Sequence, residues 1–319
     1  MFETEYAYAV ARIRSNELSL LTPEDIEMLV SADSYETALR ILTDKGWSDT
    51  AGKDGADMFE EELGKALKII SECDSRLADA LVAGNDFANL KAAIKCVFSD
   101  NDTDKYMTGP YVCSPELIAK AIKENDYGEL PDYLADVADK AYHAVTESHS
   151  GQLAEIVTDK ACLDRKLKLA KESGSDLLYR ITSLSCLVAA VKTALRSART
   201  GKSKEFALDA LCNCPGVDNE KLADAAFEGE KLGPIVAEAG YENVADYVDG
   251  DFADLEMKCD NLIVEMIETA KHEIYGPDPL AAYYYAKLAE VKNVRIILSA
   301  KSGGVPESAI RQRVRDIYV

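Results

Sequence analysis

Few residues of this chain have the types and spacing that chemistry requires. The segment Thr200–Ser203 reads TGKS and ends like a phosphate-binding loop, in which glycine amides and a lysine hold phosphate groups. That loop needs a glycine five positions before Gly201, where this chain has Arg196. A phosphate-binding loop also follows a strand, whereas the residues before Thr200 in this chain have a helical pattern. We therefore reject a phosphate-binding loop.

Cys212 and Cys214 could suggest a metal or redox pair. A zinc site needs a second pair of ligands at a suitable spacing, and the next histidine along the chain is His272. We favour a tight turn that ends at Pro215-Gly216 over a metal site.

The three histidines, His143, His149 and His272, lie in no recognisable triad or metal signature. His143 and His149 are expected at an exposed helix end. The chain contains neither Gly-x-Ser-x-Gly nor a glycine-rich dinucleotide loop. The acids Glu60–Glu62 are interpreted as a solvated face. We therefore predict no catalytic, cofactor-binding or metal-binding residues.

Two further clusters have a structural and a functional interpretation. Five bases gather on an otherwise acidic chain: Lys192, Arg196, Arg199, Lys202 and Lys204. We favour a solvated face that balances nearby acids over a functional basic patch. The run Tyr283–Tyr285 circles a helix, so at least one ring is expected in the core, with a docking surface as the alternative.

Composition narrows the classes of function. Of 319 residues, 47% are apolar, enough for a substantial core, and the formal net charge is −21. Because nucleic acids bind mostly through cations on phosphates, and anionic membranes attract basic segments, we expect neither as a partner. Proteins or basic surfaces are the expected partners. No apolar run approaches the ~20 residues that span a bilayer, and the first residues do not resemble a signal peptide. Eight cysteines scattered singly through apparent helices favour a reducing cytosol.

Helical periodicity dominates the chain and predicts an all-α fold. Apolar side chains recur at steps of three and four along residues 59–70, 87–98 and 255–270, which places them on one face of each helix. No run of alternating β-branched residues predicts a strand. Thr22-Pro23 and Ser114-Pro115 each offer a hydroxyl N-cap followed by a proline at the first helical position, and Asp218 offers a third cap signal.

A short motif occurs three times. Its pattern is an acid, two residues, an asparagine, an aliphatic residue and a base. The three copies are Asp86-Asn89-Lys91, Leu187-Ala190-Lys192 and Glu290-Asn293-Arg295. Their first residues lie 101 and 103 residues apart, and the middle copy has lost the acid and the asparagine. A long amphipathic helix precedes each copy, beginning near Phe59, Asp159 and Leu255.

The motif also has two interpretations. An acid and an asparagine three residues apart share a helix face and could present a polar pair to a partner. We favour a structural role, because buried polar groups must find partners within the fold. The three bases could pair with acids on the preceding long helix, such as Glu60 or Glu256.

The repeat divides the chain into three helical units, residues 1–109, 110–215 and 216–319. Units of this size predict three similar bundles around a pseudo-threefold axis, funnel-like with a central cavity, rather than a rod of short repeats. Residues 5–17 resemble another motif helix, and residues 305–314 resemble another cap helix. If the units close into a ring, the two chain ends should pack together.

The chain resembles one known protein family from end to end. Three segments are similar to the C subunit of A-type and V-type rotary ATPases, which is known as the d subunit in the eukaryotic vacuolar enzyme. They read YAYAVARIRSNELSLLTPEDIEMLV, DFANLKAAIK and PLAAYYYAKLAEVKNVRIILSAKSGGVPESAIRQRVRDIYV. The resemblance is strongest at both ends and weakest between residues 130 and 260.

The resemblance implies a non-catalytic, all-helical subunit of the central stalk. Members of this family join the rotor shaft, made of the D and F subunits, to the membrane-embedded proteolipid ring, and so couple ATP turnover to transport of protons or sodium. It further implies a cytoplasmic protein that is peripheral to the membrane, inserts no segment into lipid and is a monomer when isolated. No cofactor is expected.

Two alternatives remain at this point. An unrelated helical scaffold or regulatory module would bind some other protein and ignore the shaft. An enzyme using carboxylates in the central cavity would need unpaired acids flanked by apolar side chains.

Overall fold

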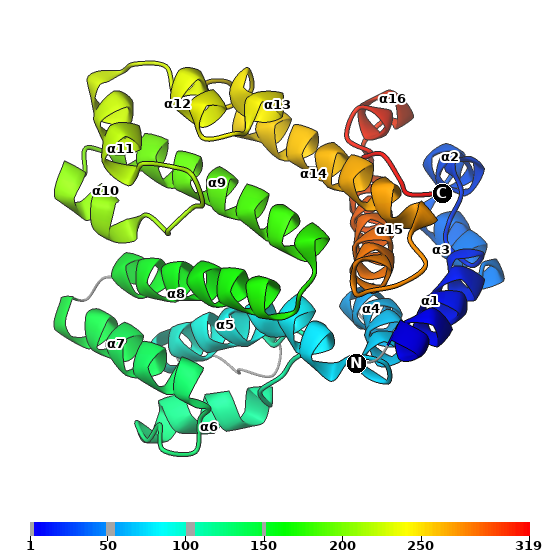
Figure 1. Cartoon of the computed structure of the whole chain (residues 1–319), viewed down its shortest axis with the longest axis horizontal. Helices are drawn as coiled ribbons and strands as arrows, with labels where there is room; N and C mark the ends of the chain where they lie inside the picture. The colour runs from blue at the N-terminus through cyan, green and yellow to red at the C-terminus, as the bar shows by residue number, and fades with distance from the viewer. Residues whose placement is uncertain (1–2, 49–54, 100–105, 149–150) are drawn as a thin grey trace. The chain divides into compact units, whose positions relative to one another are not determined.

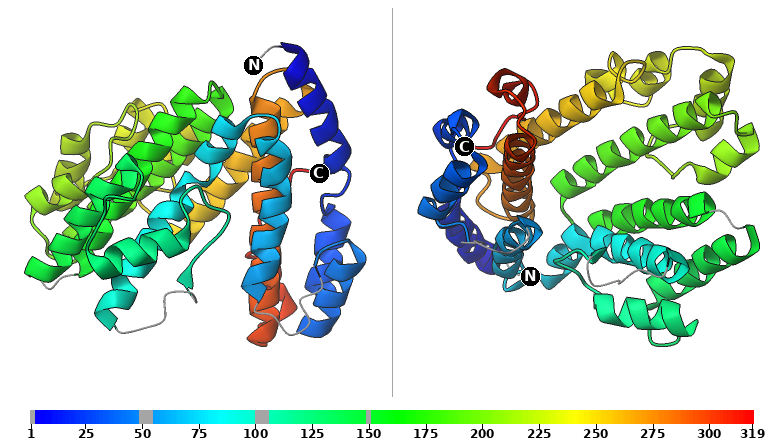
Figure 2. Two further views of the ribbon diagram at one scale, coloured as in Figure 1. Left: turned by 90° about the horizontal axis from the view of Figure 1, so that it is seen from below. Right: turned by 180° about the vertical axis from the view of Figure 1, so that it is seen from behind.

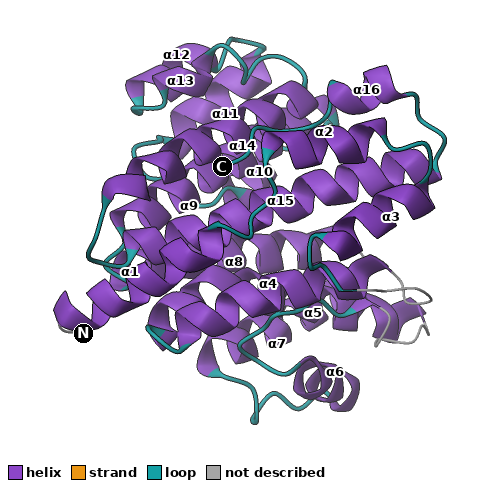
Figure 3. Cartoon of the chain, turned by 90° about the vertical axis from the view of Figure 1, so that its right-hand side faces the viewer, coloured by secondary structure: helices purple, strands orange, loops and turns teal. Residues whose placement is uncertain are grey.

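The chain is described by a computed structural model that covers residues 3–48, 55–99, 106–148 and 151–319. The described residues form helices joined by loops, without strands (Figure 3), so the predicted all-α class is confirmed. The helices are α1 (Glu3–Glu17), α2 (Pro23–Ser31), α3 (Tyr35–Asp44), α4 (Gly55–Ser71), α5 (Ser75–Ser99), α6 (Pro115–Glu124), α7 (Asp132–Ser148), α8 (Gly151–Glu172), α9 (Asp176–Arg199), α10 (Lys204–Ala210), α11 (Asn219–Glu228), α12 (Gly233–Glu238), α13 (Glu242–Ala245), α14 (Phe252–Thr269), the 3₁₀ turn η2 (Ala270–His272), α15 (Asp278–Ser302) and α16 (Glu307–Arg311).

The predicted N-caps start the short helices. Thr22 accepts a hydrogen bond from the backbone N–H of Asp25, whose carboxylate accepts the N–H of Thr22, a reciprocal capping box. Ser114 caps α6 and Asp218 caps α11 through their side-chain oxygens. Each cap satisfies N–H groups that have no partner within the helix, so the sequence marks where these helices begin.

The helices gather into two compact units (Figure 1). Unit 1 consists of Met1–Ala78, Gly174–Leu178 and Glu256–Val319, and unit 2 consists of Asp79–Ser173 and Tyr179–Leu255. Unit 1 is thus built from the two ends of the sequence, while unit 2 is built from its middle.

In unit 1, α15 is the central helix. Helices α1, α2, α3 and α4 pack against it, and α1 and α4 run alongside it in Figure 2. Apolar residues of α15 face every direction, so the helix lacks a wide polar stripe, as expected for a helix buried on most sides. Tyr283 and Tyr284 are both buried, which confirms a core position within the tyrosine run.

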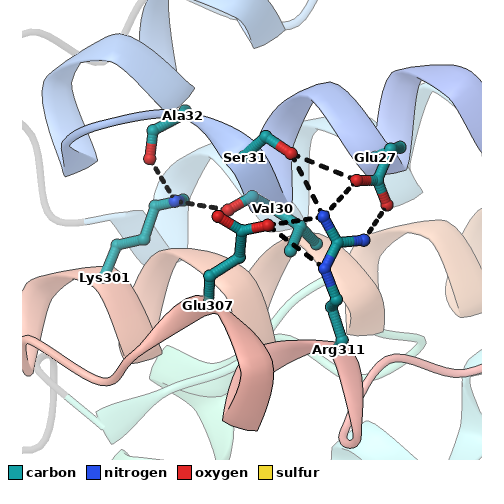
Figure 4. A network of polar contacts seen from close by, with 7 residues as sticks. All are labelled: Glu27, Val30, Ser31, Ala32, Lys301, Glu307 and Arg311. Atoms are coloured by element: carbon teal, nitrogen blue, oxygen red, sulfur yellow. Dashed lines mark hydrogen bonds and ion pairs between the residues drawn. The ribbon is translucent and has the colours of Figure 1, made fainter.

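The two chain ends meet in unit 1, as the sequence predicted. Arg311 of α16 forms ion pairs with Glu27 of α2 and with Glu307, and Lys301 at the end of α15 donates to the carbonyl oxygens of Val30 and Ala32 (Figure 4). These contacts attach α16 and the end of α15 to α2.

The final residues also contact α1. The Tyr318 hydroxyl donates to Glu17 Oε1 at 2.9 Å, and the Arg14 guanidinium donates to the Tyr318 hydroxyl at 3.1 Å. A second Arg14 nitrogen donates to the carbonyl oxygen of Ala270 at 2.6 Å. One arginine therefore connects the N-terminal helix with both the C-terminal segment (residues 312–319) and the start of η2.

In unit 2, the first core forms among α5, α6, α7 and α8. Its buried residues include Phe87, Leu90 and Ile94 of α5, Ile118 and Ile122 of α6, and Leu134 of α7. The recurring steps of three and four along each sequence put these side chains on one face, and burial of each large one contributes about 1.5–3 kcal/mol. This core fixes the face of α5 that carries the first motif.

Candidate functional site: the three repeat motifs

In the first motif, Asp86 of α5 holds the residues that lead into α6. Its Oδ1 accepts the backbone N–H groups of Val112 and Cys113 at 3.0 and 3.1 Å, and its Oδ2 accepts the Tyr133 hydroxyl at 2.6 Å. Burial raises the pKa of Asp86, while the three hydrogen bonds act in the opposite direction. The carboxylate thus works as a fixed acceptor for backbone immediately before the Ser114 cap.

Asn89 holds the same stretch, the pre-α6 segment (residues 106–113), one helical turn further on. Its Oδ1 accepts the N–H of Thr108 at 2.7 Å and its Nδ2 donates to the carbonyl oxygen of Thr108 at 3.0 Å. Asn85 donates to the carbonyl oxygen of Pro110 at 2.6 Å. A segment without regular structure thereby has backbone groups satisfied by side chains of one helix.

The third motif, on α15, repeats this arrangement with backbone from both chain ends. Glu290 Oε2 accepts the N–H of Leu21 at 2.6 Å, immediately before the Thr22 cap of α2. Asn293 accepts the N–H of Arg315 at 2.8 Å and donates to its carbonyl oxygen at 3.0 Å. The continuous pre-α6 segment of the first copy thus corresponds to two separate pieces here, the C-terminal segment and the residues before α2.

Glu290 also belongs to a buried ion cluster. Its Oε1 lies 2.6 Å from Lys287 Nζ, which lies 3.4 Å from Glu62 Oε2 and 5.5 Å from the centroid of the Trp47 ring. Lys287, Glu290 and Glu62 are 4%, 3% and 5% exposed. Burial raises the pKa of Glu290, and Lys287 counteracts that effect.

The expectation that Glu62 lies on a solvated face was wrong. Sequence reasoning took Glu60–Glu62 as one exposed acidic run, whereas Glu61 is exposed and Glu62 is buried. The signal was available: Glu62 lies between the apolar positions Met58 and Ala66, four residues from each, on the face of α4 that packs against α15.

The middle motif replaces this polar arrangement with apolar packing. Leu187 and Ala190 are both buried on α9. The spacing of 104 residues between Ser114 and Asp218 also relates Thr108 to Cys212, which lies in the pre-α11 segment (residues 211–217). The carbonyl oxygen of Cys212 accepts from Asn219 Nδ2 at 3.1 Å. An asparagine still serves this segment, but it comes from α11 instead of α9.

The base of the first motif pairs differently from our expectation. We anticipated acids on the preceding long helix, such as Glu60. Lys91 instead forms an ion pair with Asp159 of α8, a long helix that follows α5 in the sequence. Periodicity shows which face of a helix is polar, but it does not show which neighbouring helix that face meets.

The other two bases lie over aromatic rings at the corresponding place. Lys192 Nζ lies 5.8 Å from the ring centroid of Phe252, at the start of α14, and the Arg295 guanidinium lies 4.8 Å from that of Phe59, in the first turns of α4. Such cation–π contacts contribute about 0.5–2 kcal/mol. In each copy, therefore, the base contacts the first half of a long helix.

The whole chain matches a known family. A family model described as ATP synthase (C/AC39) subunit matches residues 9–313. The chain belongs to the C/AC39 family of ATP synthase subunits. Its relatives include the C subunit of the V-type sodium ATPase of Enterococcus hirae, 23% identical over 326 residues that cover 98% of this chain and 99% of the relative. They also include the C subunit of the A-type ATP synthase of Desulfurococcus sp. (strain SY), 21% identical with 98% and 92% covered.

In this C/AC39 family member, one described helix, α9, is long and apolar enough to cross a membrane. Its apolar residues lie mostly inside the fold, as in the core helix of a soluble protein: Leu177, Leu178, Ile181, Leu184, Leu187 and Val191 are buried. Length and composition are therefore weak evidence for a membrane span here.

The remaining chemistry candidates occupy ordinary positions in the fold. Thr200 and Gly201 form the turn that ends α9, and Gly201 has a positive φ of 68° that suits glycine. His143 is exposed on α7 and His272 is exposed in η2, whereas His149 lies outside the described residues. Across residues 3–48, 55–99, 106–148 and 151–319, three or more His, Cys, Asp or Glu residues nowhere gather as a metal site would require.

The basic cluster is distributed over several partners. Arg196 and Arg199 each lie 5.4 Å from the ring centroid of Phe252, beside Lys192. Lys204 forms an ion pair with Asp224. Three of the five cations therefore share contact with the Phe252 ring.

Proposed function

We propose that the chain is a non-catalytic central-stalk subunit of a V/A-type rotary ATPase. It would couple the D–F rotor shaft to the membrane proteolipid ring for ATP-linked transport of protons or sodium. The observation that carries this proposal is the family match over nearly the whole chain. The two named relatives, the C subunits of a V-type sodium ATPase and an A-type ATP synthase, are covered almost completely and support the same assignment.

We further propose three units, residues 1–109, 110–215 and 216–319, around a pseudo-threefold axis with a central cavity. The recurrence of motif contacts supports this arrangement. In two copies the acid accepts backbone N–H groups immediately before a capped helix, and the asparagine makes a pair of hydrogen bonds to the backbone of one residue. In all three copies the base contacts the first half of a long helix. Contacts that recur at this spacing are expected when one helical unit is repeated.

In this proposal the motif residues are structural. Asp86, Asn89, Glu290 and Asn293 would keep loops rigid through side-chain to backbone hydrogen bonds, and Lys91, Lys192 and Arg295 would hold neighbouring helices. Rigidity suits a coupling protein, because a soft connection would store torsion instead of passing it on. The protein would act at the cytoplasmic face of the membrane, without inserting into lipid, as a monomer when isolated.

The direct test is calorimetric titration of the full chain with the D–F shaft complex of the same organism, at low and moderate salt. We expect saturable one-to-one binding. Salt should weaken the binding if the shaft presents basic residues to this acidic chain, since screening reduces the attraction between opposite charges.

Absence of binding at both salt concentrations would lead to a second titration with the detergent-solubilised proteolipid ring present. Binding in that case would support coupling that requires the assembled ring. Absence of binding in both experiments would overturn the proposed role and favour a helical scaffold with another partner.

A further inference from the structure

A cationic pocket opens within unit 2 among α8, α9 and the pre-α11 segment, all of which appear in green to yellow-green in Figure 1. Its volume is about 360 Å³. Lys160, Lys192 and Arg196 line it, with Asp159 as an acid of the same wall. The cysteines Cys162 and Cys212 also line it. Three cations around thiols are unexpected on a chain whose net charge is −21.

Behind the pocket, Cys212 meets a second thiol. The Cys212 thiol donates to the carbonyl oxygen of Cys186 on α9 at 3.5 Å, so its sulfur lies close to Cys186, and each of the two thiols shifts the pKa of the other. Cys186 is fully buried and Cys212 is 2% exposed, so only a small reagent that enters the pocket reaches Cys212. The pair has the arrangement of an attacking thiol at the pocket and a resolving thiol behind it.

Cys212 is the thiol that lines the pocket, whereas Cys186 does not, so the geometry selects Cys212 as the thiol that meets a reagent first. The neighbouring Cys186 thiol lowers the pKa of Cys212, and the ammonium group of Lys160 acts in the same direction, against burial and Asp164. Lys160 is held near by its hydrogen bond to the carbonyl oxygen of Asp209 at 2.8 Å. Burial raises the pKa of Cys214 and Cys259 to about 12 instead. Because the thiolate is the nucleophile, Cys212 should react faster than these thiols.

We propose that Cys212 and Cys186 form a peroxide-reactive dithiol, with the cationic pocket as the entrance for a small hydroperoxide and a Cys186–Cys212 disulfide as the product. The modification would fasten the pre-α11 segment covalently to α9. It is independent of the proposed role in the central stalk.

The chemistry has two balanced steps. The Cys212 thiolate attacks one oxygen of the hydroperoxide, an S–O bond forms, the O–O bond breaks, and the departing oxygen takes a proton to leave as an alcohol or as water. The Cys186 sulfur then attacks the sulfenic sulfur of Cys212, an S–S bond forms, and the hydroxyl group leaves with the Cys186 proton as water. Two thiols lose two electrons, and the hydroperoxide gains them.

The cations have a defined part in the first step. Lys160 stabilises negative charge on the attacking sulfur. Lys192 and Arg196, which line the same pocket, would stabilise the negative charge that develops on the departing oxygen. Cys162 lines the same pocket, but burial raises its pKa. Cys162 therefore serves as an internal control, because a reagent in the pocket can reach it but its thiol has a raised pKa.

The test uses the full, reduced chain treated with hydrogen peroxide, followed by alkylation, trypsin digestion and mass spectrometry. Cys186 lies in the peptide 181–192, and Cys212 shares the peptide 205–221 with Cys214. We expect these two peptides to become linked with the loss of two hydrogens. The Cys212→Ser variant should abolish the link, and the matched variant Cys214→Ser, two residues away in the same turn, should retain it.

A second measurement avoids dependence on the folding of a variant. In the wild-type chain, alkylation by iodoacetamide, a small reagent, should modify Cys212 at least about tenfold faster than Cys259, since each unit of pKa changes the thiolate fraction tenfold below the pKa. Faster reaction of Cys162, a link that survives Cys212→Ser, or peroxide oxidation without a link between the two peptides would each overturn the proposal.

Discussion

Replacing Lys287 with methionine removes the cation that two buried carboxylates share. Lys287 is 4% exposed and lies 2.6 Å from Glu290 and 3.4 Å from Glu62. Removal of one partner from a buried ion pair costs about 3–5 kcal/mol, because the remaining charge stays desolvated without compensation. We expect Lys287→Met to lower the free energy of unfolding near neutral pH by this amount.

The matched control is Lys65→Met, which removes a different cation from the same Glu62. The Lys65 side chain is 48% exposed and lies 2.5 Å from Glu62. Because the Lys65 ammonium group is partly exposed, solvent screens this ion pair, and Glu62 keeps Lys287 as a partner, so Lys65→Met should cost less stability than Lys287→Met. The contrast separates burial of the cation from loss of an ion pair as such.

The loss should depend on pH. Burial already raises the pKa of Glu290 above that of the unfolded chain, so its contribution to stability is most favourable below the unfolded pKa and declines as pH rises towards the folded pKa. Lys287 lowers that folded pKa, and its removal moves the value further up. Lys287→Met should therefore be less destabilising at about pH 5 than at about pH 7.5.

Urea denaturation followed by tryptophan fluorescence is a suitable assay. Trp47 is the single tryptophan of the chain, and its ring centroid lies 5.5 Å from Lys287 Nζ. The double variant Lys287→Met with Glu290→Gln should recover most of the lost stability, because it removes the uncompensated charge. Equal losses at both pH values, or equal losses for Lys287→Met and Lys65→Met, would refute the reasoning.

Three further predictions concern the loops and caps. Asn89→Ala should speed amide hydrogen exchange in the pre-α6 segment alone, and Asn293→Ala should speed it in the C-terminal segment alone. The reason is that each asparagine makes two hydrogen bonds to one segment. Faster exchange in both segments after either change would contradict this. Thr22→Ala should cost about 0.5–2 kcal/mol of unfolding free energy through loss of the capping box, measured by thermal denaturation. Tyr318→Phe should cost about 1 kcal/mol through loss of its hydrogen bond to Glu17, and a change below the error of a urea titration would show that this contact is replaced by water.

The sequence predicted the class of the fold and the starts of helices well. Caps such as Thr22 and Asp218 act on N–H groups within the next turn, so their effect is local and readable from a few neighbouring residues. The meeting of the two chain ends was predicted on the condition that the repeated units close into a ring, and Arg14, Tyr318 and Arg311 show that the ends do meet.

The partners of the motif residues could not be predicted. Periodicity places Lys91 on a polar face, but its contact with Asp159 depends on which helix packs there. The burial of Glu62 was missed because its neighbours Glu60 and Glu61 gave the run an exposed character. Long-range pairing of this kind depends on tertiary packing. A single sequence whose middle repeat lacks the acid and the asparagine gives little information about that packing.

The construction of unit 1 from both ends of the sequence determines when it can fold during synthesis. Helix α4 leaves the ribosome roughly 200 residues before α15, the helix that covers it. At about 5–20 residues per second, the delay is about 10–40 s. During that time Phe59, Leu63 and Ile70 of α4 have no core to enter, and a nascent chain with this exposed apolar face is a substrate for chaperones. Unit 2 is complete in the nascent chain before α15 emerges, so the part of the protein translated first is the last to become folded.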